Sequence, residues 1–586
     1  MCDFRNHDNY GFIKSMNQRE VSDLIVWSQS NGCKISENIE FRLSANGVSA
    51  FLKNSELPSE PSVFVPTSMI ISPRIAYCEL ELGESANPVI ALKLLLCRWK
   101  SGREHQFGPY IACLPLLRNI GSPLAFSSEE LTFLSGTNMY HGVLLKRKQL
   151  IAEYRKALSY LKVKNPTKYE DYDQAQFFKT IMEETSNKCQ YPPSFAWFLW
   201  AHLIVTSRSF PYKLIDPEAS DDSVMLLPII DLFNHKPRSK VTWVPSSAGF
   251  ELRLQGGADI SGELFNNYGP KGNEELLMGY GFAIVDNENE QLQLTIDVNG
   301  VCEKCLQMWQ VPLLQLKEYT YPVCDDEAST SNQSNPTSVV FLSNRSHIVP
   351  DGLLELFASR CADLDDTHKT LKALLKGLSN LKSALDIKFK QKLDKFQTFP
   401  STLKGTGYFE SEEMMSSLQT SYENSCIYRQ SQLHLWLLLK RKLKNLEKEL
   451  LKQYRSSIIT IGDIMKKESF MLDVATQLRI PLVKDVLSSY DKEVLIRIWV
   501  LRVTEGAQSH FDTDWVKREF ASVSPVVRYD VSEVSQMYDD LKEFAQLLKL
   551  NSWSLESLTK ADHVVMRNSY AKGSSKETVL IRPTSL

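Results

Sequence analysis

Apolar residues near the start of the chain recur first with a helical period and then in short strand-like runs. Residues 20–32 carry apolar side chains at helical spacing, and an Asn-Gly pair ends the pattern, so we expect an amphipathic helix there. Two β-rich runs follow. Residues 40–43 lead into an Asn-Gly turn, and residues 63–66 end in a proline that marks a strand end or an edge strand.

The pattern between residues 88 and 200 is helical. It predicts helices at residues 89–99, 127–134, 140–163 and 177–185. The most apolar run of the chain, residues 195–205, includes a histidine and is far shorter than the ~20 residues that a bilayer crossing needs. We therefore expect residues 195–205 to form a buried core helix, and we expect no membrane-spanning segment.

Short apolar runs separated by turn signals return after residue 225. They predict strands at residues 241–244, 250–254 and 291–296. Strand-rich pieces thus bracket a helical insertion at about residues 88–200. This arrangement predicts an α+β fold, and it does not fit a series of βαβ repeats.

The second half of the chain is mostly helical in pattern. Residues 325–338 are polar and low in complexity, which favours an exposed loop inside a linker over residues 301–350. A second loop is expected at residues 399–425. Leucines at helical spacing, with Lys and Glu between them, then predict helices at residues 353–396, 431–454, 485–506 and 532–550.

Composition narrows the class of protein. The chain has 586 residues, 43% of them apolar and 23% charged, as expected for a globular protein of two to four domains. The 67 basic residues are balanced by 70 acidic ones, so no overall basic field exists to hold nucleic acid. The first residues contain no apolar stretch typical of a secretory signal.

The cysteines are too sparse for a disulfide scaffold. There are 11, an odd number, and we expect reduced thiols and a cytoplasmic protein, with the nucleus as the alternative. Only Cys302 and Cys305 form a C-x-x-C pair. No second pair stands at zinc-site spacing, so we expect no metal site.

Three segments between residues 201 and 282 combine polar clusters with apolar runs. They are residues 207–210 (Ser-Arg-Ser-Phe), residues 231–235 (Asp-Leu-Phe-Asn-His) and residues 268–282, which begin Tyr-Gly and end Tyr-Gly-Phe. Each has an ordinary interpretation by itself: a helix-end cation, a buried capping pair and core tyrosines. Their occurrence together, in this order, favours a functional site.

These segments resemble the SET-domain protein methyltransferases of the Rubisco large-subunit methyltransferase type. That family's pattern is S-R-x-F after a Trp-rich helix, then D-x-x-N-H, then Y-G-x-x-x-N-x-E-L-x-x-x-Y-G-F, and this chain matches all three. Weaker matches extend the resemblance over roughly residues 20–300. It implies a SET β-fold over residues 20–300, interrupted by the helical insertion, and an all-α substrate-binding domain over residues 351–586.

The resemblance also implies S-adenosylmethionine as the cofactor and a role for each matching residue. Arg208 would bind the cofactor's carboxylate through charge-assisted bonds. Tyr268 would be the catalytic residue, its hydroxyl orienting the incoming amine, and Asn266 would brace the crossing of two segments. The remaining cofactor-binding residues would be Asn46, Gly47, Val48, Asp231, Asn234, His235, Tyr280, Gly281 and Phe282.

The implied function is methyl transfer to a lysine of a non-histone protein, such as a ribosomal protein, an elongation factor or cytochrome c. A histidine acceptor is an alternative, because one relative methylates an actin histidine. A catalytically inactive SET-fold adaptor is another. The family usually has Gly-x-Gly near its N-terminus, whereas residues 45–50 contain only Gly47, which favours the adaptor. The partner would be a protein with an accessible lysine, and the oligomeric state stays open.

Overall fold

The computed structural model describes residues 17–44, 47–53, 60–83, 85–102, 104–163, 173–255, 262–298, 303–311, 338–362, 368–397, 412–477, 479–482, 486, 492–523, 539, 542, 545–546, 553–572 and 577–583. The chain divides into two compact units. Unit 1 comprises residues 1–292, 317–332 and 391–435. Unit 2 comprises residues 293–316, 333–390 and 436–586.

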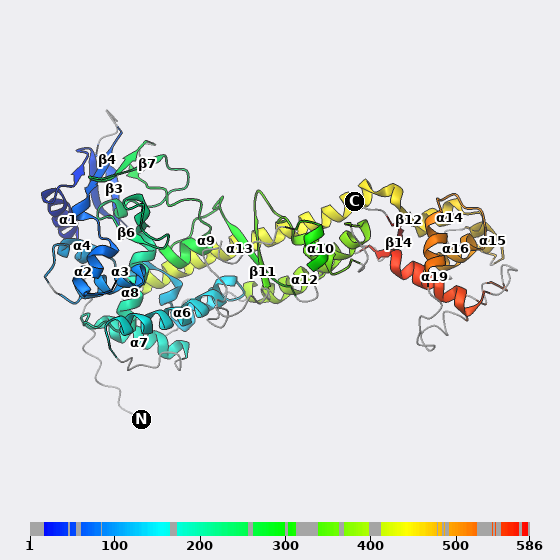
Figure 1. The fold of residues 1–586 in the computed structure, drawn as a ribbon, viewed down its shortest axis with the longest axis horizontal. Helices are drawn as coiled ribbons and strands as arrows, with labels where there is room; N and C mark the ends of the chain where they lie inside the picture. The colour runs from blue at the N-terminus through cyan, green and yellow to red at the C-terminus, as the bar shows by residue number, and fades with distance from the viewer. Residues whose placement is uncertain are drawn as a thin grey trace, which may run out of the picture. The chain divides into compact units, whose positions relative to one another are not determined.

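The strands of unit 1 form small antiparallel sheets that lie together in Figure 1. One sheet has the order β1-β4-β8-β7, and a second has the order β2-β3-β9. In β4, Val63 and Val65 are fully buried while their neighbours are half-buried, as the two-residue period of a strand requires. The bounds are β1 Lys34–Ile35, β2 Ile39–Ser44, β3 Gly47–Leu52, β4 Ser62–Pro66, β7 Val241–Ser246, β8 Gly249–Leu254 and β9 Glu263–Leu264.

Helices make up most of the rest of unit 1. The first, α1 (Gln18–Ser30), begins with a capping box formed by Asn17 and Glu20. The longest apolar helix, α8 (Phe195–Arg208), is buried from Phe195 to Val205, which confirms the expected core helix. The others are α2 Pro73–Leu80, α3 Pro88–Lys100, α4 Gly108–Cys113, α5 Ser128–Thr132, α6 Asn138–Tyr160 and α7 Gln174–Ser186.

Short elements after α8 carry the segments singled out in the sequence. They are β5 (Ser209–Pro211), β6 (Val224–Leu226), the single turn η6 (Ile230–Leu232), α9 (Asn273–Glu275) and the π-helical turn η7 (Leu276–Tyr280). β5 pairs with β6. Strand β10 (Gln291–Asp297) follows. Single π turns occur often at functional sites, and η7 lies in the longest motif match.

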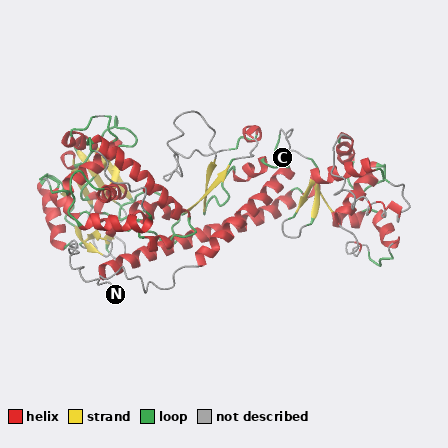
Figure 2. Ribbon diagram, turned by 90° about the horizontal axis from the view of Figure 1, so that it is seen from below, coloured by secondary structure: helices red, strands yellow, loops and turns green. Residues whose placement is uncertain are grey.

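Unit 2 is mostly helical, as Figure 2 shows, but it is not all-α. Strands β12 (Ile458–Thr460), β14 (Thr578–Ile581) and β13 (Ser569–Ala571) form a three-stranded antiparallel sheet. The expectation of an all-α C-terminal domain is therefore wrong, because these runs of three or four residues are too short to show a period. The helices are α11 Leu353–Ser359, α12 Leu371–Gln397, α14 Ile461–Lys467, α15 Phe470–Gln477, α16 Lys492–Thr504, α17 Asp514–Ser522 and α19 Leu555–Asn568; the residues of α12 from 391 on belong to unit 1.

Helix α13 (Glu412–Gln453) differs most from its sequence expectation. The predicted loop over residues 399–425 is helical from residue 412 onward, and residues 398–411 lie outside the described part of the chain. The division into units places residues up to 435 in unit 1 and the rest of the helix in unit 2. A polar sequence concealed the helix because most of its buried side chains in unit 1 are themselves polar.

The predicted linker also contains regular structure. Helix α10 (Glu303–Met308) and strand β11 (Ser338–Asn344), which pairs with β10, lie within residues 301–350. The helix expected over residues 353–396 is divided into α11 and α12, and most of the one expected over residues 532–550 falls outside the described residues. No described helix combines the length and apolar content that a bilayer crossing requires.

Candidate active site

An arginine–aspartate pair forms the buried base of the site. The Nη1 atom of Arg208, at the end of α8, donates to the Asp231 backbone oxygen at 3.0 Å and to Oδ2 at 3.2 Å. The hydroxyl of Tyr110, from α4, donates to the same Oδ2 at 2.7 Å. Burial opposes the charge of Arg208, but Asp231 outweighs it and raises the pKa of the guanidinium. A fixed positive charge therefore lies beside η6.

The backbone before η6 is strained. Ile229 is fully buried and has φ 76°, a conformation that a β-branched residue rarely adopts. Such a conformation costs on the order of 1–3 kcal/mol and persists only where the surrounding structure fixes it. Ile229 stands two residues before Asp231, the residue that Arg208 contacts. The sequence contains no signal for this strain.

Two segments cross at Asn266. Its backbone N–H donates to the Asn234 oxygen at 2.8 Å, and its own oxygen accepts from the Lys236 N–H at 3.1 Å. The Asn266 side-chain oxygen also accepts from the indole of Trp243 at 3.1 Å. Asn266 is almost fully buried and thus ties residues 234–236 to the strand that leads to Tyr268.

Asn234 connects this crossing to the N-terminal hairpin. Its Nδ2 donates to Ser49 Oγ and to Glu263 Oε1, both at 2.8 Å. Ser49 lies on β3, next to the buried Val48 and two residues after Gly47. Gly47 has φ 95°, which glycine adopts readily, and a Cβ there would meet open space. The predicted Asn46 lies outside the described residues.

Four aromatic rings line one side of the site. The rings of His235 and Tyr268 stack at 4.9 Å between centroids, and those of Tyr268 and Tyr280 stack at 5.2 Å. Phe282 lies 6.4 Å from both His235 and Tyr280. The Tyr268 hydroxyl donates to the Phe233 oxygen at 2.8 Å. The predicted catalytic tyrosine is therefore held at both its ring and its oxygen.

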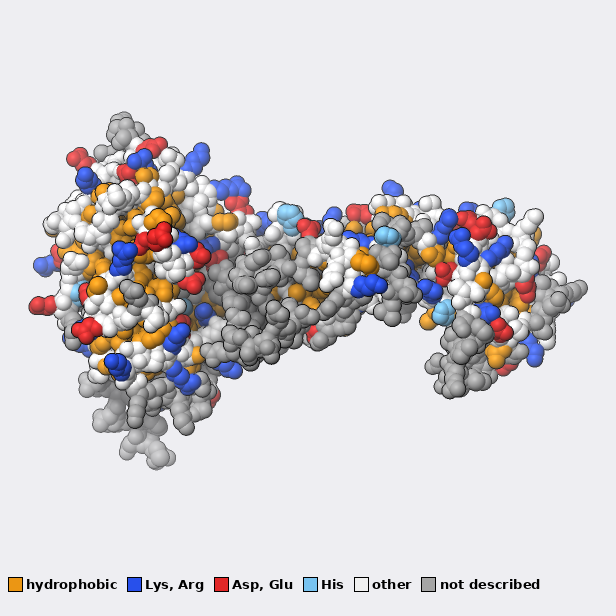
Figure 3. Space-filling view, viewed as in Figure 1, with side chains coloured by type: hydrophobic (Ala, Val, Ile, Leu, Met, Phe, Trp, Pro, Cys, Tyr) orange, Lys and Arg blue, Asp and Glu red, His pale blue; other side chains and the backbone are white. Residues whose placement is uncertain are grey.

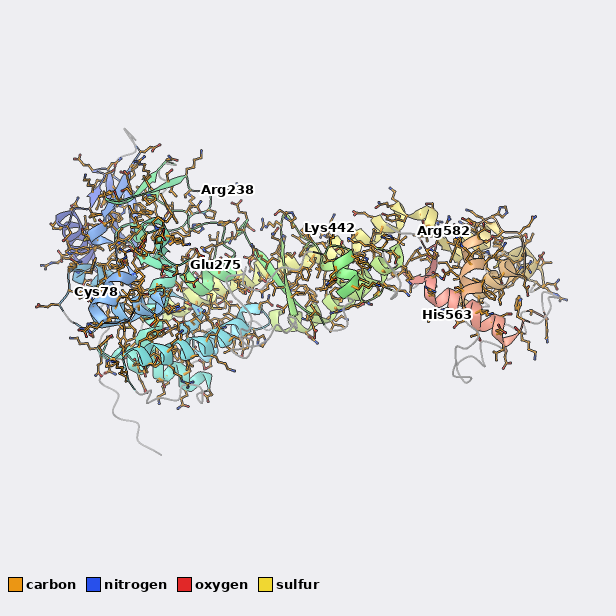
Figure 4. The ribbon with its side chains drawn as sticks, viewed as in Figure 1. Cys78, Arg238, Glu275, Lys442, His563 and Arg582 are labelled. Carbon is orange, nitrogen blue, oxygen red and sulfur yellow. The ribbon has the colours of Figure 1, made fainter. Side chains whose placement is uncertain are left out.

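Burial keeps these rings uncharged. It raises the pKa of Tyr268, with Arg208 opposing the shift, so the phenol stays protonated. Burial lowers the pKa of His235 to about 4, and the ammonium of Lys271 lowers it further. Lys271 pairs with Glu275, which is labelled in Figure 4, and lies over the Tyr280 ring at 5.6 Å. Neutral rings beside a fixed cation suit a site that excludes water.

Three buried polar atoms at the site have no hydrogen-bond partner among the described residues: Arg208 Nε, Asp231 Oδ1 and His235 Nε2. His235 Nδ1 accepts from the Tyr268 N–H at 3.0 Å, so the proton of the neutral imidazole belongs on Nε2. The orphaned atoms are thus two donors and one acceptor. Buried groups of this kind are costly, and a polar ligand that paired with them would lower that cost.

Backbone contacts hold the Tyr-Gly-Phe segment in place. A Cβ on Gly281, whose φ is 82°, would lie 1.6 Å from the oxygen of Ile120, in the turn η2 (Leu117–Ile120). A Cβ on Gly121 would lie 2.6 Å from the Gly281 oxygen, and Ser122 Oγ donates to the Met278 oxygen at 2.6 Å. Only glycines allow two backbones to approach this closely.

No family model matches the chain. Two yeast proteins that are similar over nearly its whole length agree with the motif resemblance. Ribosomal lysine N-methyltransferase 1 of Saccharomyces cerevisiae is 27% identical to it, over 97% of this chain and 100% of that protein. Protein-lysine N-methyltransferase EFM1 of the same yeast is 22% identical, over 96% and 98% of the two chains.

Solved structures identify the fold. The SET domain of LSMT bound to lysine and AdoHcy matches with a TM-score of 0.50 at 16% identity, over 74% of this chain and 92% of that one. Rubisco LSMT bound to sinefungin and monomethyllysine matches with the same score at 17% identity, over 74% and 93%. The chain has the SET fold of the Rubisco large-subunit methyltransferase type.

The SET fold brings together the segments that the sequence had singled out. Arg208 contacts Asp231, the ring of His235 stacks on Tyr268, and Asn234 contacts the β3 strand that contains Val48. Which of these residues bind a cofactor stays a prediction. Three contributors were not predicted: Tyr110, Ile229 and Gly121. Only Gly121 carries a signal, the turn-forming pair Gly-Ser.

The side chains of this cluster suit an organic ligand. Among the residues that the structure describes, no group of three or more His, Cys, Asp or Glu is placed to hold a metal ion. What this cluster offers is a charged guanidinium, neutral hydrogen-bond donors and stacked rings. These groups suit a ligand that has a carboxylate and aromatic nitrogens, together with an incoming side chain.

Proposed function

We propose that this protein transfers a methyl group from S-adenosylmethionine to the side-chain nitrogen of a lysine in a non-histone protein. The observation that carries the proposal is the fixed position of Tyr268, whose ring stacks on His235 and Tyr280 and whose hydroxyl donates to the Phe233 oxygen. Arg208 and Asp231 are near enough to this phenol to influence its pKa. The near-full-length similarity to yeast protein-lysine methyltransferases supports the same reaction. The intact cluster favours an enzyme over an inactive adaptor.

The orphaned polar atoms fit the proposed cofactor. Arg208 Nε and His235 Nε2 are donors, and a carboxylate and an adenine both present acceptors for them. Asp231 Oδ1 is an acceptor that suits an ammonium group. When bound, S-adenosylmethionine supplies an electrophilic methyl group on a positively charged sulfur. We infer that Gly47 and Val48 contribute backbone to the same site, since Asn234 ties their strand to it.

Tyr268 is proposed to orient the acceptor amine rather than to remove its proton. The phenol donates its own proton to the Phe233 oxygen, which leaves the lone pairs of the hydroxyl oxygen to accept an N–H. A free lysine has a pKa near ~10.4 and is charged at neutral pH. The apolar rings of Tyr268, Tyr280 and Phe282 disfavour that charge, so entry into the site itself promotes the neutral, nucleophilic amine.

The substrate is proposed to be a protein of the translation machinery that is met in the cytoplasm. One yeast relative is named as a ribosomal lysine methyltransferase, and both relatives cover nearly the whole chain, including the helical region over residues 351–586. We infer that this region binds the substrate protein. Acidic and basic side chains are interspersed on the face of unit 1 seen in Figure 3, which favours a protein partner over nucleic acid.

Methyl transfer in a cell extract tests this function. The full-length protein and a methyl-labelled donor are added to an extract of cells that lack the gene, with Tyr268→Phe as the matched control. We expect label on one or a few proteins with wild type only, and mass spectrometry should place it on lysine. Label on histidine would show that the acceptor is a histidine and not a lysine. Binding of the donor without any methyl transfer would support the inactive adaptor instead of the enzyme.

A further inference from the structure

Helix α13 buries polar side chains where a helix normally buries apolar ones. Within unit 1 the helix buries five polar side chains at helical spacing, each at most 4% exposed, between the buried Leu418 and Leu435: Ser421, Ser425, Tyr428, Arg429 and Gln432. From residue 435 to residue 443 the buried positions are apolar: Leu435, Trp436, Leu439 and Leu443. Because a buried polar group destabilises unless it is paired, the contacts of this polar face show what it does.

The polar face binds the segment that supplies the aromatic wall of the site. The backbone N–H of Ala283, the residue directly after Phe282, donates to Asn424 Oδ1 at 2.9 Å. The hydroxyl of Tyr428 donates to Glu274 Oε2, in α9, at 2.7 Å. These two bonds lie on either side of the π turn that contains Tyr280, so both ends of that turn are attached to one helix.

A second set of bonds closes the same segment upon itself. The side chain of Asn273 donates to the Ile284 oxygen at 3.0 Å and accepts from the Ile284 N–H at 2.9 Å. The carboxylate of Glu290 accepts from Ser431 at 3.0 Å and from Gln432 at 2.8 Å. Asn273 thereby ties the start of the segment to Ile284 near its end, and Glu290 bonds the same region to α13. Arg429 extends the attachment to the backbone oxygen of Phe133 at 3.2 Å.

We propose that Asn424 and Tyr428 of α13 are positioning residues for methyl transfer. They hold the turn over residues 273–283 so that the Tyr280 ring stacks on Tyr268 and Phe282 lies beside His235. This proposal rests on the proposed function, since it concerns the rate of the same reaction. The hydrogen bonds described for these two residues run to Ala283 and Glu274, not to the four rings. We therefore expect them to act through Ala283 and Glu274, so that their substitution lowers kcat and leaves cofactor affinity nearly unchanged.

Substitutions in the full-length protein separate positioning from simple packing. Asn424→Ala removes the acceptor for Ala283, whereas Asn424→Asp keeps an oxygen in its place. Tyr428→Phe keeps the buried ring and removes only the bond to Glu274. The matched control is Gln419→Ala, on the exposed face of the same helix. Within the described residues, the Gln419 side chain donates a hydrogen bond to Glu423 one turn further along the helix.

We expect Asn424→Ala and Tyr428→Phe to lower kcat by about 10-fold or more, with cofactor Kd changed less than about 3-fold. Asn424→Asp should recover most of the lost turnover, and Gln419→Ala should match wild type. A kcat equal to wild type in both Asn424→Ala and Tyr428→Phe would overturn the proposal. So would a loss of turnover in Asn424→Asp as large as in the alanine variant.

Hydrogen–deuterium exchange supplies a readout that needs no activity. Amides of residues 280–284 should exchange faster in Asn424→Ala than in wild type or Asn424→Asp. Unchanged exchange in Asn424→Ala would overturn the proposal. If wild type transfers no methyl to any acceptor while exchange responds as expected, the proposed function fails and the structural attachment stands. If wild type is active and the variants are equally active, the positioning role fails alone.

Discussion

At the scale of single residues, the Tyr268 side chain is held in two ways: its hydroxyl donates one hydrogen bond, and its ring stacks on neighbouring rings. Its hydroxyl donates to the Phe233 oxygen, and the rings of Tyr280 and His235 both stack on its ring. Because the ring is held by stacking, removing the oxygen leaves the shape of the site intact. The hydroxyl can therefore be tested separately from the ring.

Tyr268→Phe should lower kcat about 100-fold or more, because one preorganised polar group at a reacting centre is commonly worth that much. The stacking with His235 and Tyr280 persists, so cofactor affinity should change little. Single-turnover rates with labelled donor, together with calorimetric titration of the cofactor, measure the two quantities. Turnover close to wild type would reject the catalytic role of Tyr268.

Asn234→Ala should weaken cofactor binding about 10-fold. It removes the bonds to Ser49 and Glu263, each worth ~1 kcal/mol, and so releases the hairpin that contains Gly47 from the segment that contains His235. Calorimetry measures the affinity. Asn187→Ala is the control, because its side chain donates only to the Glu183 oxygen at an exposed helix end. Equal affinities in the two variants would count against this role.

At the scale of elements, the close approach of η2 and the residues after η7 determines where the Tyr-Gly-Phe segment lies. Gly281 and Gly121 face each other across this contact. Motif matching identified Gly281 but gave no reason for it, since the opposing backbone is about 160 residues away in sequence. The reason is steric, and substitution can measure it.

Gly281→Ala should reduce the free energy of unfolding by on the order of 4 kcal/mol, from left-handed strain and from the collision with the Ile120 oxygen. Gly506→Ala is the matched control. Gly506 has φ 98°, but a Cβ there meets nothing within 4 Å, so only strain of about 1 kcal/mol applies. Urea denaturation of both variants gives the comparison. Equal losses would show that the backbone contact contributes nothing.

Glu290, which accepts hydrogen bonds from Ser431 and Gln432 of α13, should make the stability of the protein depend on pH. Burial raises the pKa of Glu290 from 4.5 to about 7, although Ser431 and Gln432 oppose the shift by donating to the carboxylate. The folded chain then holds a proton that the unfolded chain releases above about pH 4.5. The free energy of unfolding should therefore fall as the pH rises from about 4.5 to 7, and level off above that.

Glu290→Gln should remove this component, which is on the order of 3 kcal/mol at 1.4 kcal/mol per pKa unit. Urea midpoints of wild type and variant at pH 5 and pH 8 provide the measurement. The variant should gain stability relative to wild type at the higher pH. A difference between the two proteins that is the same at both pH values would contradict a raised pKa.

At the scale of the whole molecule, thiol accessibility reports whether the chain adopts this fold. Cys78 and Cys97 are both free thiols. Cys78, labelled in Figure 4, is exposed, whereas Cys97 is fully buried between helices of unit 1 and burial raises the pKa of its thiol. Buried thiols with a raised pKa react slowly, because the thiolate is the nucleophile.

Alkylation of the native protein should modify Cys78 at least ~100-fold faster than Cys97. Peptide mass spectrometry after timed exposure to iodoacetamide measures the two rates in one sample. In urea the two rates should converge, since unfolding exposes both thiols. Equal rates in the native protein would mean that the helices around Cys97 are not packed as described here.

The sequence by itself determined the α+β class, the SET resemblance and most of the residues that cluster at the site. Those features are local: helical and strand periods, turn pairs, and three motifs whose spacing is read along one chain. Asn424 and Tyr428 meet their partners across 141 and 154 residues, and the strain at Ile229 depends on everything packed around it. Only the tertiary structure decided these, because a polar residue becomes part of a buried network only once its distant partner is beside it.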